Sequence, residues 1–262
     1  MRNACSAMSP GGMTKPMIRT WASALIFGAF AAGQGHAETC RDVAFEGGTF
    51  AVCTVPAEAD LRLFLKNGES KPIGSFDSLR ARVEGEGGTL AFAMNAGMFH
   101  ADRSPVGLYV EDRREIAPIV TSAGPGNFGL RPNGVFCVSA DTFAIRESRD
   151  FARATPDCRY ATQSGPMLVI DGELHPRFLA ASDSLYIRNG VGVSGDGKTA
   201  EFAISNQPVN FHTFARFFRD VLGTPQALYF DGSISRLYAP ELGRFDLGLP
   251  MGPMVGLVVP AG

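Results

Sequence analysis

Short apolar runs of strand length, separated by turn residues, dominate this sequence and constrain its fold more than any other feature. Apolar or alternating runs of about four to eight residues are typical of β-strands, whereas a helix repeats its apolar residues every three or four positions. The 31 Gly and 17 Pro agree with many turns. We expect strands over residues 49–55, 61–66, 89–94, 106–111, 134–139 and 142–146.

Two β-hairpins are indicated by turn sequences that favour positive φ angles. Residues 167–170 are followed by Asp171-Gly172. Residues 186–194 lead through Gly195-Asp196-Gly197-Lys198 into a further run at 199–205. Because Asp-Gly and Gly-Asp-Gly suit tight hairpin turns, both connections predict antiparallel pairing.

Helices are expected to be fewer. One helix is predicted over 76–83, and a better one over 211–222, where phenylalanines recur at spacings of three and four and Asn210 can cap the start. The second helix leads into a short apolar strand at 227–230. The predicted class is therefore α+β, a single domain with a mixed, mostly antiparallel β-sheet core covered by a few helices.

The first 37 residues have the layout of a secretory signal peptide. They contain no acidic residue, Lys15 and Arg19 precede an apolar run at 21–32, and small residues lead up to Ala37. We expect cleavage after Ala37, a mature domain over 38–262, a periplasmic or secreted location, and no stable membrane insertion after cleavage. An uncleaved membrane anchor is the alternative, which the short apolar run disfavours.

Removal of the leader changes the charge and the cysteine count. Three basic residues leave with it, so the net charge falls from −2 to −5, and no basic field remains to bind nucleic acid. Cys5 leaves as well. An even set of cysteines in an exported chain predicts two disulfides. Three pairings are possible; we favour Cys40–Cys53 and Cys137–Cys158, because each closes a short loop around hairpin-like sequence. Zinc binding is disfavoured by the cysteine spacing.

Four segments place polar residues and glycine at or near the ends of predicted strands, where binding sites are usually built. From them we take three candidate catalytic residues and six candidate substrate-binding residues. The candidate catalytic residues are Asp231, Arg188 and Asn95; the candidate substrate-binding residues are Ser164, Gly165, Gly97, His100, Gly232 and Ser233.

Each candidate also has a purely structural interpretation. Asp231 and Asn95 are common turn caps. Arg188 can pair with a core carboxylate, or it can face a cleft and bind a phosphate. The bend at Gly165-Pro166 is expected to expose the Ser164 hydroxyl.

Other chemistries find little support. The mature chain contains His100, His175 and His212, and none has the spacing of a metal pair or a catalytic-triad motif. We expect no cofactor and no metal site, although Asp102, Asp171 and Asp231 could supply oxygen ligands, so the sequence leaves metal dependence open.

In their order and spacing, the four segments resemble elements of the phosphodiester glycosidase domain family. The members of this family are relatives of N-acetylglucosamine-1-phosphodiester alpha-N-acetylglucosaminidase. That family includes the mammalian enzyme that uncovers the mannose 6-phosphate signal, and bacterial envelope proteins described as exopolysaccharide-related. The resembling elements are Asn95–Phe99, Ser164–Leu168, Arg188–Gly192 and Phe230–Ser235. The last departs from the family's Asp-Gly-Gly-Gly-Ser, because residues 233–235 read Ser-Ile-Ser.

The resemblance implies an exported hydrolase that cleaves a sugar-1-phosphodiester in the bacterial envelope, with a carbohydrate phosphodiester as its partner. Arg188 would then serve the phosphate with Ser164 and Ser233, Asp231 would act as base or stabilise the cationic sugar, and Asn95 would hold sugar hydroxyls. Two alternatives remain open. One is a non-catalytic envelope protein that binds glycan or polymer in the same cleft; the other is a serine-dependent hydrolase.

Overall fold

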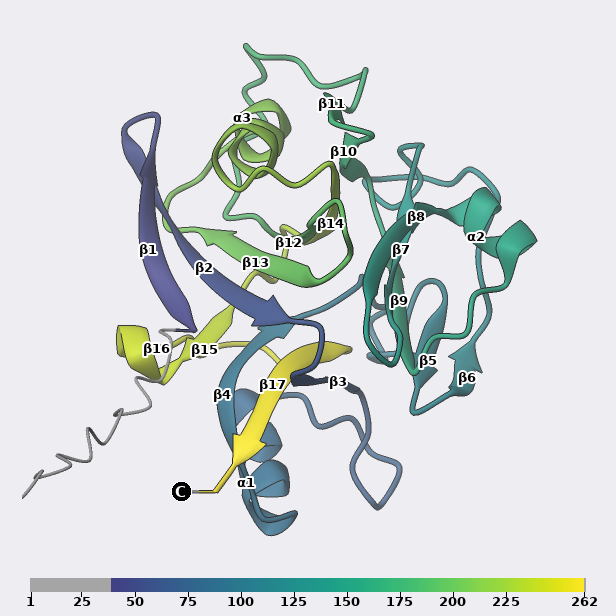
Figure 1. Ribbon diagram of the computed structural model, residues 1–262, viewed down its shortest axis with the longest axis vertical. Helices are drawn as coiled ribbons and strands as arrows, with labels where there is room; N and C mark the ends of the chain where they lie inside the picture. The colour runs from purple at the N-terminus through teal and green to yellow at the C-terminus, as the bar shows by residue number, and fades with distance from the viewer. Residues whose placement is uncertain (1–38, 262) are drawn as a thin grey trace, which may run out of the picture. The chain divides into compact units, whose positions relative to one another are not determined.

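The computed structural model describes residues 39–261, in which three antiparallel sheets carry short helices (Figure 1). The largest sheet has the order β1 (Cys40–Phe45), β2 (Gly48–Pro56), β13 (Thr199–Ser205), β12 (Asn189–Val193), β14 (Gln226–Asp231), β10 (Met167–Ile170), β11 (Glu173–Leu174). The second has the order β16 (Arg244–Phe245), β15 (Leu237–Ala239), β4 (Gly88–Asn95), β17 (Met254–Pro260), β3 (Asp60–Phe64). The third has the order β6 (Arg114–Ala117), β5 (Tyr109–Glu111), β9 (Tyr160–Ser164), β7 (Gly134–Val138), β8 (Phe143–Glu147).

The helices are α1 (Phe76–Gly85), α2 (Ser148–Ala154), α3 (Phe211–Arg216), the π-helix η1 (Phe217–Val221) and the 3₁₀-helix η2 (Pro240–Leu242). Every strand pairing between the named strands is antiparallel. The α+β class is thereby confirmed.

The predicted signal peptide, residues 1–37, lies outside the described residues. Among the helices of residues 39–261, none combines the length and the apolar character that a membrane-spanning helix requires.

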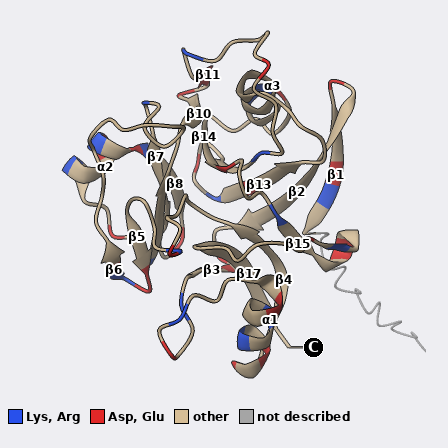
Figure 2. Ribbon diagram, turned by 180° about the vertical axis from the view of Figure 1, so that it is seen from behind, with Lys and Arg blue, Asp and Glu red and all other residues tan. Residues whose placement is uncertain are grey.

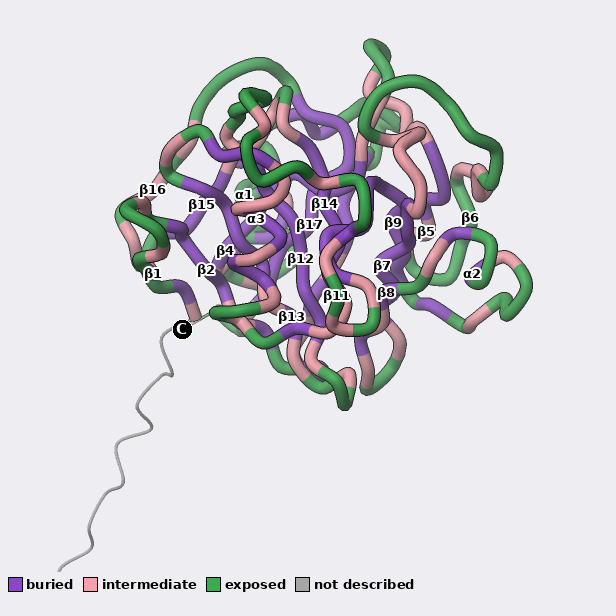
Figure 3. Tube along the Cα trace, turned by 90° about the horizontal axis from the view of Figure 1, so that it is seen from above, coloured by how far each residue is buried: buried purple, intermediate pink, exposed green. Residues whose placement is uncertain are grey.

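The three sheets share one apolar core around Phe202 of β13. Its ring lies 5.4 Å from that of Phe92 in the second sheet and 5.7 Å from that of Phe136 in the third, between ring centroids. Phe230 of β14 completes the group at 6.5 Å. Figure 3 shows β12, β14 and β17 buried along most of their length. The strand ends that carry polar residues are therefore held by packing from three sides.

Both favoured disulfides are confirmed. Cys40 and Cys53 face each other in the β1–β2 hairpin, with their Cα atoms 4.0 Å apart. Cys137 of β7 is bonded to Cys158, which comes just before the neighbouring strand β9. Each bond closes a local loop, as the hairpin-like sequence indicated.

Most predicted elements are present, with instructive differences. The strand expected over 106–111 begins only at Tyr109, and the strand β17 at 254–260 was not predicted. The helix expected over 211–222 is α-helical to Arg216 and continues as η1, with Asn210 capping its start as predicted. The widened turn leaves both Phe217 and Phe218 fully buried, which the one-face pattern did not anticipate.

A buried histidine couples the stability of this fold to pH. His175 follows β11 and is 1% exposed. Its Nδ1 accepts a hydrogen bond from the Arg177 amide, so Nε2 carries the proton and donates it to the Arg131 carbonyl. Burial, assisted by the charge of Arg177, lowers the pKa of His175 to about 4.

We expect the fold to lose stability as the pH falls below about 6.5. His175 then binds a proton in the unfolded chain but stays neutral in the folded chain until the pH approaches 4. The stabilisation is complete above pH 6.5, and about 2.5 kcal/mol of it is lost by pH 4.5. Urea unfolding at pH 7.5 and 4.5 measures this loss. His175→Gln should show a smaller pH-dependent loss, whereas His212→Gln, at the partly exposed start of α3, should behave like the unaltered chain. Equal losses in all three proteins would contradict the assignment.

Candidate active site

The four segments singled out in the sequence meet at one place in the fold. Asn95 at the end of β4 hydrogen-bonds Asn189 at the start of β12, and the Gly97 amide donates to Thr162 of β9. The Ser164 hydroxyl at the end of β9 donates to the Phe230 carbonyl of β14, at 2.8 Å. Strand ends from all three sheets therefore build a single polar cluster.

Two asparagines lie at the centre of this cluster, and both are fully buried. The Asn189 Nδ2 donates to the Asn95 carbonyl at 2.9 Å and to Asn95 Oδ1 at 3.1 Å. Asn95 Nδ2 donates back to Asn189 Oδ1 at 3.2 Å, and Asn95 Oδ1 also accepts from the Arg236 amide. The side chain of Asn95 therefore hydrogen-bonds other groups of the protein, which makes Asn95 a positioning residue in this structure.

Asn189 carries the connection to Asp231. Its Oδ1 accepts hydrogen bonds from the Asp231 amide at 3.2 Å and from the Ser235 hydroxyl at 3.3 Å. The two strands shift register here: Gly190 pairs with Tyr229, but Asn189 pairs with Asp231, so β14 holds one extra residue. Such bulges re-aim side chains next to functional sites.

Asp231 is the buried carboxylate of the cluster. It is 9% exposed, and its Oδ1 accepts from the amides of Gly232 at 2.6 Å and Ser233 at 2.8 Å. Its Oδ2 has no hydrogen-bond partner within residues 39–261. Burial raises the pKa of Asp231, although the backbone amides oppose the rise. The turn-cap and catalytic interpretations are thus compatible: one oxygen holds the turn and the other is free.

Arg188 is fully buried, with an exposed fraction of 0%. Its Nε donates to the Val209 carbonyl and its Nη2 to the Ser184 carbonyl, and its guanidinium lies 3.7 Å from the ring centroid of Phe211. Nη1 lies 3.4 Å from the Tyr229 hydroxyl. Neither sequence-based alternative describes this arrangement, because no ion pair joins Arg188 to a carboxylate among the described residues and no open cleft reaches its guanidinium.

Ser164 is also fully buried, so the expectation that the Gly165-Pro166 bend exposes its hydroxyl is wrong. The physical reason is that Ser164 pairs with Gly134 of β7 at the end of β9, where its hydroxyl donates to the Phe230 carbonyl of β14. Gly165 and Gly97 serve close packing, since a Cβ on either would overlap Asn133 or Gln163 respectively.

The remaining candidates divide between the cluster and the surface. Gly232 packs on the Tyr229 hydroxyl so closely that a Cβ would overlap it, and Ser233 is exposed beside Asp231. His100 is exposed in a turn closed by the Ser104 carbonyl, and no hydrogen bond within the described chain joins it to Asp231 or Asn95.

Sequence reasoning missed Asn189, Tyr229 and Ser235. Asn189 follows Arg188 in a segment already singled out, and a second buried amide at a strand start was the available signal. Tyr229 looked like core because it lies within an apolar strand. Within residues 39–261, no three His, Cys, Asp or Glu side chains group as metal ligands do.

A buried carboxylate with a free oxygen, fixed by amides at the ends of sheet strands, defines a site for a polar ligand on an α+β fold. The model of the phosphodiester glycosidase family matches residues 88–246, which include Asn95, Ser164, Arg188 and Asp231. The chain belongs to this family of hydrolases.

The chain is also similar to individual proteins. The chain is 34% identical over 183 residues to the uncharacterized protein YigE of Escherichia coli K12, a match that covers 70% of this chain and 71% of YigE. Among solved structures, the catalytic domain of zebrafish N-acetylglucosamine-1-phosphodiester alpha-N-acetylglucosaminidase, auto-inhibited by its pro-peptide, superposes with a TM-score of 0.58. The identity is 13%, and 83% of this chain and 81% of that chain are covered. A putative exported protein of Burkholderia pseudomallei superposes with a TM-score of 0.50 and 13% identity, and the match covers 80% of this chain and 74% of that protein. At these identities the superpositions show a shared fold.

Proposed function

We propose that this chain hydrolyses a sugar-1-phosphodiester in the bacterial envelope, releasing the sugar from a phosphate-linked group. The observation that carries the proposal is Asp231, a buried carboxyl group with a raised pKa and one oxygen free of protein partners, in a chain of the phosphodiester glycosidase family. The two disulfides support an oxidising compartment outside the cytoplasm.

The leaving group sets what the site must supply. A phosphate monoester departs readily, so little general-acid assistance is required when the bond between sugar C1 and oxygen breaks. A water molecule must then reach C1, and the developing positive charge on the sugar must be stabilised. A carboxylate such as Asp231 can accept the proton of that water or oppose the charge.

The neighbouring residues act on Asp231 through position. Asn189 holds the Asp231 amide, while Asn95 holds Asn189 and the Arg236 amide. Buried Arg188 supplies positive charge behind the site rather than a direct contact with phosphate, and Tyr229 lies between that charge and the Gly232 turn. Ser164 fixes the end of β14 through Phe230, so a role as nucleophile is disfavoured.

Turnover separates this proposal from a binding function. The purified chain, incubated with an N-acetylglucosamine-1-phosphodiester, should release free sugar with saturation kinetics, and an active-site serine reagent should leave the rate unchanged. Saturable binding of the same compound without release of sugar would instead indicate the non-catalytic envelope protein.

The activity should fall as the pH decreases, because Asp231 must be ionised to act. Since burial raises its pKa, the acid limb of kcat/KM should lie above 3.8, the ordinary value for an aspartate. A pH–rate profile between pH 3.5 and 8, with unfolding followed in parallel, measures this. An activity that stays constant down to pH 3.8 in folded protein would contradict the role of Asp231.

A further inference from the structure

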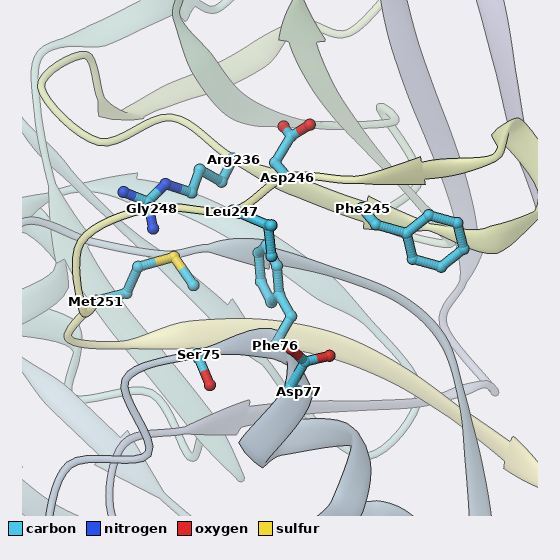
Figure 4. A pocket seen from close by; sticks show the side chains of 9 residues that line it. All are labelled: Ser75, Phe76, Asp77, Arg236, Phe245, Asp246, Leu247, Gly248 and Met251. Carbon is cyan, nitrogen blue, oxygen red and sulfur yellow. The ribbon is translucent and has the colours of Figure 1, made fainter.

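A small cavity lies on the side of the second sheet, and one of its lining residues, Arg236, is joined to the candidate active site through its backbone amide. The volume of the cavity is about 70 Å³, and its walls include Arg236, Gly248 and Asp77. Figure 4 shows the Arg236 side chain along one side of the cavity, and Ser75 and Asp77 at the start of α1 on the other. Whole-ligand pockets usually measure several hundred Å³, so this cavity fits one small group.

Hydrogen bonds join the backbone around Arg236 to Asn95 and Asp231 of the candidate active site. The Arg236 amide donates to Asn95 Oδ1 at 2.9 Å, and the preceding residue, Ser235, donates its hydroxyl to the Asp231 carbonyl at 2.7 Å. These hydrogen bonds hold the backbone of Arg236 at a fixed position relative to Asp231.

The loop after β16 is built around this guanidinium. Arg236 Nη1 donates to the Leu249 carbonyl at 2.6 Å. Gly248 has a φ of +149°, and a Cβ there would overlap Nη2 of Arg236, so only glycine accommodates the side chain as it lies. The arrangement leaves Nε and Nη2 without hydrogen-bond partners within residues 39–261.

Two carboxylates, Asp77 and Asp246, also line the cavity, and each has a partner other than Arg236. Asp246 accepts from the Leu237 amide at 2.9 Å and forms an ion pair with Arg244 at 2.9 Å. Asp77 lies 3.9 Å from Arg80 on α1, a helix that carries both signs of charge (Figure 2). No carboxylate of the described chain lies within 4.0 Å of Arg236, which is only partly exposed.

We propose that this cavity is a subsite for a second phosphate, carried by the part of the substrate beyond the scissile phosphodiester, with Arg236 as the cation that binds it. A guanidinium with two unused donor groups suits the oxygens of a phosphate. The inference rests on the proposed function for its link to catalysis, and it narrows the substrate to phosphodiesters whose released group carries a further phosphate.

Equilibrium binding tests the subsite without turnover. We compare glycerol 1,3-bisphosphate, which mimics a released group with two phosphates, with glycerol 3-phosphate, which has one. The unaltered chain should bind the bisphosphate about tenfold to a hundredfold more tightly, the range of one charge-assisted contact. Arg236→Gln should remove this preference, and Gly248→Ala should reduce it by displacing the guanidinium. Arg114→Gln, a charge change on the exposed edge strand β6 of the third sheet, should retain it.

The outcomes are separable. An unaltered chain that binds both compounds equally, or that binds neither, overturns the subsite. So does an Arg236→Gln or Gly248→Ala protein that keeps the full preference while its circular dichroism is unchanged. Failure of the proposed function appears differently, as an absence of sugar release from any sugar-1-phosphodiester while the preference for the bisphosphate persists.

Discussion

Replacement of Asp231 by Asn is expected to lower kcat/KM for a sugar-1-phosphodiester by about a thousandfold, within the range that a positioned general base contributes. The amide oxygen of Asn can still accept from the Gly232 and Ser233 amides, so the turn survives. What disappears is the negative charge on the free oxygen. The free energy of unfolding should change by less than about 1 kcal/mol, and steady-state kinetics with urea unfolding measure the two effects.

A matched control exists in the β12–β13 hairpin. Asp196 also caps a turn, since it accepts from the Lys198 amide at 2.9 Å, but it is exposed and remote from the polar cluster. Asp196→Asn should leave turnover within twofold of the unaltered chain. If folded Asp231→Asn retains more than a tenth of the activity, Asp231 is only a turn cap.

Replacement of Asn189 by Ala is expected to give the largest loss of stability, about 3 kcal/mol, together with a large loss of activity. The side-chain amide of Asn189 takes part in five hydrogen bonds, which connect it to Asn95, Asp231 and Ser235. All of them are removed at once, and the polar groups left behind stay buried without partners. Urea unfolding and kinetics on the same preparations measure both effects.

Asn67→Ala is the control for this change. Asn67 is exposed and accepts only local hydrogen bonds, from the amides of Glu69 and Lys71, both at 3.0 Å. It should cost about 1 kcal/mol or less and leave activity intact. A loss at Asn189 no larger than the loss at Asn67 would show that the buried amide pair does not hold the site.

The same reasoning explains why Arg188→Ala is a poor test of catalysis. The sequence suggested a phosphate ligand, but the side chain is fully buried against Phe211 and two carbonyls. Its removal leaves a cavity and takes the side-chain donors away from the Val209 and Ser184 carbonyls, so lost activity would not separate a catalytic role from lost structure.

Local sequence predicted local structure well in this chain. Strand periodicity, the Asp171-Gly172 turn and the Asn210 cap involve neighbours along the chain, and each is present. Strand β17 escaped prediction although it lies between β4 and β3. Its role as a central strand depends on partners distant in the sequence, which periodicity does not report.

The sequence predicted where along the strands the candidate site residues lie, but not the direction in which their side chains point. Asn95 and Asp231 do lie close together, because both end strands that the core aligns. Whether a side chain turns inward depends on tertiary contacts: Ser164 turns toward Phe230 and Arg188 toward Val209, and neither contact is encoded near those residues. Asn189 was missed for the same reason. Its side chain matters because it hydrogen-bonds Asn95 and Asp231, which lie 94 and 42 positions away in the sequence.

One measurement tests the central claim most directly: hydrolysis of an N-acetylglucosamine-1-phosphodiester in ¹⁸O-labelled water, with the released phosphate monoester analysed by mass spectrometry. Attack at the sugar C1 breaks the bond between carbon and oxygen, so the account predicts free sugar and a phosphate monoester without ¹⁸O. Incorporation of ¹⁸O into the phosphate would mean attack at phosphorus, and saturable binding without any release of sugar would mean a binding protein. Either result would contradict the account.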